Sequence, residues 1–134
     1  MWTVSGFSAR GVQLPVGIAL CAALAGCGSP AEPDLLVEPI QIDSVDVLVQ
    51  ESSPPTASAR VRGVVGDGCS EIHSVRQERS DVTVTLAILR ERPRNAVCTQ
   101  IARLYDERIP LQGSFPPGDY VLRVNDFVRP FSTR

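Results

Sequence analysis

The feature that most constrains this chain is a period-two alternation of apolar and polar residues in short runs. In residues 82–88 the even-numbered positions are all apolar: Val82, Val84, Leu86 and Ile88. Successive side chains of a β-strand point to opposite faces, so this pattern predicts a strand with one buried face.

The same alternation predicts strands over residues 40–50 and 57–66, separated by the Ser- and Pro-rich residues 51–55. A turn at Gly66-Asp67-Gly68 and a shorter strand over residues 69–76 follow. Two or three more strands are expected within residues 105–131, with a tight turn at Asn125-Asp126, because these residue types accept positive φ. Only residues 96–104 resemble a helix, since Val97, Ile101 and Leu104 have i, i+4, i+7 spacing.

Brief strands with frequent turns are typical of a β-sandwich. We therefore predict an all-β fold: a small antiparallel β-sandwich of about seven strands with one short helical turn. The body, residues 40–134, forms one domain and is too short for a doubly wound nucleotide-binding fold or a TIM barrel.

Residues 1–26 have the layout of an export signal. The apolar run over residues 12–24 is shorter than the ~20 residues of a transmembrane helix. It leads into Leu24-Ala25-Gly26-Cys27, which resembles the lipobox of bacterial lipoproteins. That resemblance implies that the signal is cut before Cys27 and that the Cys27 thiol carries a diacylglyceryl group. The alternative is an ordinary cleaved signal.

Residues 27–39 are rich in Pro and acidic residues and are interpreted as the lipidated cysteine followed by a flexible tether. The resemblance implies a protein of the bacterial cell envelope, held to the membrane by the lipid on Cys27 and facing the periplasm or the exterior. Residue 28 is Gly rather than Asp, which favours the outer membrane where the host has one.

Export places the remaining cysteines in an oxidising compartment. With Cys21 in the signal and Cys27 lipidated, we expect Cys69 and Cys98 to form a disulfide. The alternative, a metal site of two free thiols and His73, lacks a fourth ligand at suitable spacing. No cofactor and no metal are expected.

Residues 117–124, Pro-Gly-Asp-Tyr-Val-Leu-Arg-Val, resemble a run common in immunoglobulin-like and fibronectin-like bacterial domains. The resemblance implies an immunoglobulin-like sandwich in which Tyr120 packs at a corner and its hydroxyl bonds to backbone. Residues 61–131 are also similar to secreted bacterial domains that have a Gly-x-Gly-Cys turn, a second Cys about 30 residues later and a Pro-Gly-x-Tyr hairpin. The likeness implies a fold but no activity, because such scaffolds carry many functions.

His73, the single histidine, is the candidate catalytic residue. Ser70, Ser74 and Asp67 are near it in sequence, but neighbours along a strand do not converge, so a surface histidine in a loop is the preferred interpretation. Carboxylate pairs give no better candidate: Asp106 and Glu107 would point apart, and Asp67 with Glu71 offers too few calcium ligands.

All 13 cationic residues are Arg, and the net charge of −2 argues against nucleic-acid binding. Arg90, Arg92 and Arg94 form the densest cluster. They could contact anionic headgroups, cell-wall polymer or an acidic envelope protein, or form a solvated turn. The C-terminal aromatics are expected in the core rather than in a carbohydrate-binding stripe: Phe115, Tyr120, Phe127 and Phe131.

Taken together, these patterns predict a lipid-anchored, non-catalytic binding or structural module. Its surface would be the loops near Arg90–Asn95 and Gly66–Cys69. One alternative is a small envelope enzyme that uses His73 or a carboxylate pair. Another is an inhibitor or chaperone-like protein that acts through an exposed strand edge.

Overall fold

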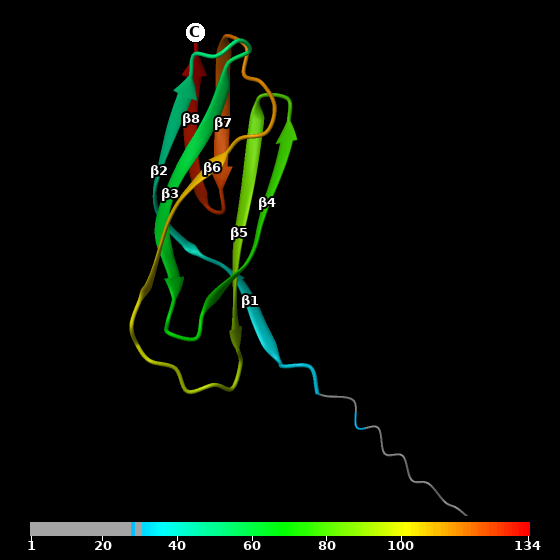
Figure 1. Ribbon diagram of the computed structural model, residues 1–134, viewed down its shortest axis with the longest axis vertical. Coiled ribbons are helices and arrows are strands. Elements are labelled where there is room, and N and C mark those ends of the chain that lie inside the picture. The colour runs from blue at the N-terminus through cyan, green and yellow to red at the C-terminus, as the bar shows by residue number, and fades with distance from the viewer. Residues whose placement is uncertain (1–27, 29–30) are drawn as a thin grey trace, which may run out of the picture. The chain divides into compact units, whose positions relative to one another are not determined.

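Eight strands in two sheets make up the fold (Figure 1), as described by a computed structural model that covers Gly28 and residues 31–134. The predicted all-β class is confirmed, with one strand more than expected. In chain order the strands are β1 (Leu35–Pro39), β2 (Gln41–Gln50), β3 (Thr56–Gly66), β4 (Glu71–Ser80), β5 (Thr83–Pro93), β6 (Arg103–Pro110), β7 (Gly118–Val124) and β8 (Phe127–Thr133). Within this part of the chain, no helix is long and apolar enough to cross a membrane.

Strand β5 organises the larger sheet. It pairs with β4 on one side, and on the other with β7 over residues 83–86 and with β1 over residues 89–93, while β8 pairs with β7. The smaller sheet has the order β2-β3-β6. All of these pairings are antiparallel except β5 with β7, which is parallel, so the expected antiparallel sandwich needs correction at this one pair.

The core lies between the sheets and is built from the alternating rows. Val84, Leu86 and Ile88 of β5 are fully buried, as the alternation predicts. Val82 is 44% exposed because it lies in the turn before β5, so its predicted inward position is wrong. From the smaller sheet, β3 contributes four buried side chains to the same core: Ala57, Ala59, Val61 and Val65.

Asn125 occupies the point where the neighbour of β5 changes from β7 to β1. Its Oδ1 accepts a hydrogen bond from the Ile88 N–H at 2.9 Å. Its Nδ2 donates to the carbonyl oxygens of Ile40 at 2.9 Å and Ile88 at 3.1 Å. The residue has φ of +50°, as the predicted tight turn requires. The Asn125 amide thus provides hydrogen-bond partners for backbone groups of Ile88 and Ile40 at the gap between β7 and β1.

The C-terminal aromatics pack as expected. The Phe115 ring is fully buried and lies edge-on to Tyr120, which stacks on Phe131. The Tyr120 hydroxyl donates to the backbone oxygen of Pro116 at 2.8 Å. Phe127 also packs against the core.

The boundary expected between tether and body is corrected by β1. Residues 35–39 pair with β5 and belong to the same compact unit as the rest of the sandwich, Glu32–Arg134. The run is only five residues long and shows no clear alternation, so its sequence gives little sign of a strand. Pairing with the C-terminal half of β5 makes these residues part of the sheet.

The helical turn expected over residues 96–104 is absent. Residues 94–102 form an irregular connection, and β6 begins at Arg103. A nine-residue segment is too short to be a stable helix without an apolar surface to pack against. Here Cys98 is tied to Cys69 and β6 pairs with β3, so both ends of the segment are held in extended backbone.

Candidate binding surface at the disulfide-linked end

A disulfide joins two connections at one end of the sandwich. Cys69 follows β3 and Cys98 lies between β5 and β6, with their Cα atoms 5.5 Å apart, in agreement with the predicted pairing. The Gly68 N–H also donates to the Thr99 carbonyl at 2.9 Å. We call residues 66–70 and 94–104 the disulfide-linked end.

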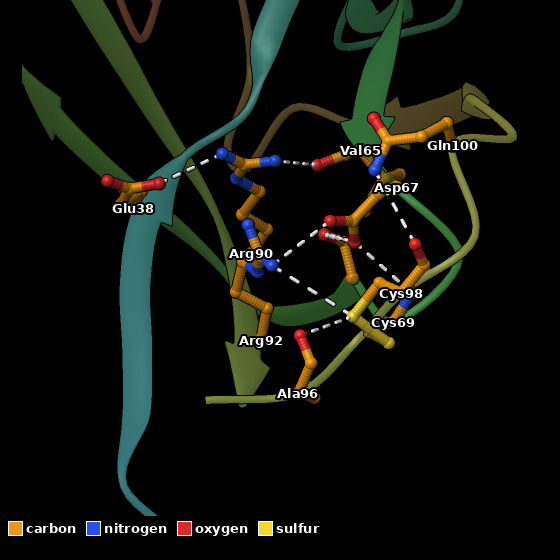
Figure 2. A network of polar contacts seen from close by, with 10 residues as sticks. Glu38, Val65, Asp67, Cys69, Arg90, Arg92, Ala96, Cys98 and Gln100 are labelled. Carbon is orange, nitrogen blue, oxygen red and sulfur yellow. Dashed lines mark hydrogen bonds and ion pairs between the residues drawn. A yellow bond between two sulfur atoms is a disulfide. The ribbon is translucent and has the colours of Figure 1, made fainter. Parts of the chain in front are cut away.

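Asp67 fixes the conformation of the β3–β4 turn (Figure 2). Its Oδ1 accepts hydrogen bonds from the Ser70 hydroxyl at 2.9 Å and the Cys69 N–H at 3.2 Å, and its Oδ2 lies 3.3 Å from a guanidinium nitrogen of Arg92. The Ser70 hydrogen bond is the largest cause of a lowered Asp67 pKa, followed by the Cys69 N–H and the charges of Arg92 and Arg90. The carboxylate is therefore ionised at neutral pH and acts as a structural acceptor.

Two glycines let the backbone segments approach. Gly66 has φ of +145°, and a Cβ there would lie 2.2 Å from an Arg90 nitrogen. A Cβ on Gly68 would lie 2.0 Å from the Thr99 hydroxyl oxygen. A side chain at either position would displace one of its neighbours, so the Gly-x-Gly-Cys spacing suits this packing.

The predicted partner residues Arg90, Arg92 and Arg94 each form an ion pair within the domain. Arg90 and Arg92 lie in β5, which continues to Pro93, whereas Arg94 lies in the exposed turn that follows. Arg90 donates to Glu38 at 2.9 Å and to the Val65 carbonyl at 3.1 Å, so it joins β1, β5 and β3 (Figure 2).

The two neighbouring arginines are also paired within the domain. Arg92 reaches Asp67, as described above, and Arg94 lies 3.1 Å from Asp34. The three guanidinium groups therefore hold the ends of strands together. Each of the three guanidinium groups is thus paired with a carboxylate of the same domain.

The residues expected on the inner side of a helix are instead the most exposed apolar residues of the described chain. Val97 is 103% exposed, Leu104 77% and Ile101 70%. The segment that carries them is fastened at several points: by the disulfide, by the Gly68–Thr99 bond, and by Arg103, which donates to the Ser70 carbonyl at 2.8 Å. Exposed apolar residues on a fixed segment are typical of an interaction site.

The candidate catalytic residues do not come together. His73 lies in β4 at a bulge, not in a loop, and its Nδ1 contacts the Glu91 carboxylate. Ser70 is fully buried and bonded to Asp67 rather than to His73.

The carboxylate and metal candidates are also occupied. Asp106 accepts two hydrogen bonds from Arg60, which lower its pKa, and has no carboxylate partner within hydrogen-bonding distance in the described part of the chain. Asp67, Cys69 and Cys98 place potential ligand atoms within 4.8 Å of one another. Both sulfurs are bonded in the disulfide, however, and a disulfide supplies no thiolate for a metal. The predicted lipidation site, Cys27, lies outside the described residues.

Thr99 and Arg103 were not identified from sequence, although both hold the disulfide-linked end together. Their contacts pair residues about 30 positions apart, and nothing in the local pattern indicates them. The Gly-x-Gly spacing beside Cys69 gives only an indirect indication, because glycine leaves room for a close neighbour without identifying it.

The two packed sheets, joined at one end by the Cys69–Cys98 disulfide, define a small disulfide-containing β-sandwich domain. The chain belongs to the family of the ORF11 beta-sandwich domain, whose model matches residues 59–133. It is similar to an uncharacterized 10.2 kDa protein in the HgiCIIM 5′ region of Herpetosiphon aurantiacus, with 33% identity over 87 residues, covering 65% of this chain and 93% of that protein.

Two further proteins of the same organism are similar as well. They are uncharacterized 10.2 kDa proteins in the HgiBIM and HgiEIM 5′ regions, each 31% identical over 75 residues, covering 56% of this chain and 92% of the relative. No solved structure matches the chain.

Proposed function

We propose that this protein is a lipid-anchored, non-catalytic module of the bacterial cell envelope that binds through its disulfide-linked end. The lipobox-like Leu24-Ala25-Gly26-Cys27 supports the anchor, and Gly28 favours the outer membrane where one exists. A disulfide between Cys69 and Cys98 is consistent with an exported protein.

The observation that carries the binding role is the exposure of Val97, Ile101 and Leu104 on a fastened segment. A mobile loop would lose conformational entropy on binding, whereas a segment already held by a disulfide and backbone hydrogen bonds loses less. The segment is therefore suited to presenting apolar side chains to a partner.

The anchor is tested with two matched variants. Cys27→Ser should abolish labelling by an alkyne fatty acid and release the protein from the membrane fraction, because the acyl chains supply the attachment. Cys21→Ser removes a cysteine that lacks the lipobox context, and should leave both labelling and fractionation unchanged. A Cys27→Ser protein that stays labelled and membrane-bound would contradict the proposed anchor.

We further infer that the sandwich is immunoglobulin-like. The bond from the Tyr120 hydroxyl to Pro116 supports this, since it matches the corner that the resemblance implies. An experimental structure that aligns all eight strands with the immunoglobulin topology, or fails to, decides the assignment.

The second candidate is a partner role for a strand edge, favoured by β4. Among the described strands β4 pairs only with β5, and Ile72 and Val75 on it are 37% and 44% exposed. An extended peptide could add to such an edge. Val75→Pro would block edge pairing and should abolish binding by this route, whereas it should leave binding by the disulfide-linked end intact.

A further inference from the structure

We propose that the disulfide-linked end docks on the surface of the bilayer that holds the lipid anchor, with Val97, Ile101 and Leu104 entering the interfacial region. This inference rests on the proposed anchor at Cys27. It names the occupant of the exposed apolar surface as lipid rather than as a second protein.

The chain enters the domain beside the segment that carries the exposed apolar residues. The Arg94 N–H donates to the Asp34 carbonyl at 2.9 Å, and the two side chains form an ion pair. Asp34 immediately precedes β1, and Arg94 begins the segment that carries Val97 and Ile101. Figure 1 shows β1 starting toward the end of the sandwich that holds the β5–β6 connection, while the C-terminus lies at the opposite end.

The chain between the proposed anchor and the domain is short. Six residues lie between Cys27 and Asp34, and the seven residue steps from Cys27 to Asp34 span at most about 25 Å when fully extended. Because β1 takes up residues 35–39, the connection is shorter than the whole 27–39 stretch would allow. A lipid on Cys27 would therefore keep Asp34, and with it the adjoining disulfide-linked end, within reach of the bilayer surface.

The surface of the disulfide-linked end is apolar, and the charges around it are paired. Its exposed apolar side chains number three over eight residues, and the arginines around them are matched by acidic groups: Arg92 by Asp67, Arg94 by Asp34 and Arg103 by Glu71. A surface that is apolar and nearly neutral gains from insertion between headgroups rather than from attraction to anionic lipid. We therefore expect docking on zwitterionic membranes, with little dependence on salt.

The experiment uses a tryptophan placed at the surface. Trp2 is the single tryptophan of the sequence and lies within the predicted signal, so the mature protein should contain none. Lipidated Val97→Trp protein is reconstituted into phosphatidylcholine vesicles with brominated acyl chains, which quench nearby indole emission. Glu51→Trp, an exposed position in the β2–β3 connection at the opposite end, is the matched control.

Docking predicts a blue-shifted emission for Val97→Trp and a several-fold larger loss of intensity than for Glu51→Trp, with the same result at Leu104→Trp. Equal, weak quenching in protein whose mass shows the acyl chains would overturn the docking and leave the anchor standing. Mature protein without acyl chains would overturn both. Photo-crosslinking from position 97 in intact envelopes to a protein rather than to lipid would replace the bilayer by a protein partner.

Discussion

Asn125 is the residue whose replacement tests the fold most directly. Replacement by Gly keeps the positive φ accessible but removes three side-chain hydrogen bonds. The Ile88 carbonyl keeps a second partner, the Ile40 N–H at 3.1 Å. The Ile88 N–H and the Ile40 carbonyl lose the side chain that satisfies them, and both residues are buried.

Each backbone group left without a partner costs about 1–3 kcal/mol. Water can reach part of this site, because Asn125 is only partly buried and borders a depression lined by Ile40 and Ile42. We therefore expect Asn125→Gly to lower the free energy of unfolding by about 2–4 kcal/mol, a large part of the ~5–15 kcal/mol typical of a domain. Urea denaturation of the oxidised protein measures this difference.

The chain offers a matched control at Asp81, which has φ of +54° in the β4–β5 turn. Among the described contacts its side chain makes no hydrogen bond; only its carbonyl accepts one, from Arg79. Asp81→Gly carries the same gain of unfolded-chain entropy as Asn125→Gly but breaks no buried contact. If the two variants lost equal stability, the conclusion that Asn125 satisfies the junction between β7 and β1 would be refuted.

Three more predictions follow from the disulfide-linked end. Gly68→Ala should lower the thermal midpoint, because the new methyl would meet the Thr99 hydroxyl. Adding Thr99→Ala removes that hydroxyl and should restore part of the loss. If the effects of the two substitutions on the midpoint were purely additive, this contact would be excluded. Replacing Cys69 and Cys98 by Ala opens a loop with a sequence separation of 29 and should cost ~3.5 kcal/mol in urea denaturation, with the Gly68 amide exchanging faster. The pKa of Asp67 is lowered from 3.8 in the folded state, so the ionised carboxylate contributes fully to stability above that value and loses this contribution as the pH falls through the folded-state pKa. Asp67→Asn should therefore flatten the acid side of a plot of urea midpoint against pH. An unchanged slope would contradict the assigned hydrogen bonds.

The alternating strands could be predicted from sequence because burial on one face imposes a local pattern. The inward row of β5 and that of β3 follow directly from it. β1 could not be predicted, since its five residues show no clear alternation and their pairing depends on the distant end of β5. The parallel pairing of β5 with β7 is likewise set by topology and leaves no mark on either strand.

Two groups of residues near the disulfide show how partners distant in sequence determine what a surface presents. Arg90, Arg92 and Arg94 are dense in charge, yet each is paired with a carboxylate distant in sequence: Glu38, Asp67 and Asp34. Val97, Ile101 and Leu104 have helical spacing, yet their disulfide-linked segment is an irregular connection that runs into β6, so no helix forms there to bury them.

Long-range partners decide whether a charge is paired and whether an apolar side chain is covered. A periodic pattern reports burial only when its segment is free to adopt the corresponding period. In residues 94–104 the disulfide removes that freedom, so the apolar residues remain exposed. The proposed docking on a bilayer would cover these three side chains and so remove the loss of solubility that their exposure causes.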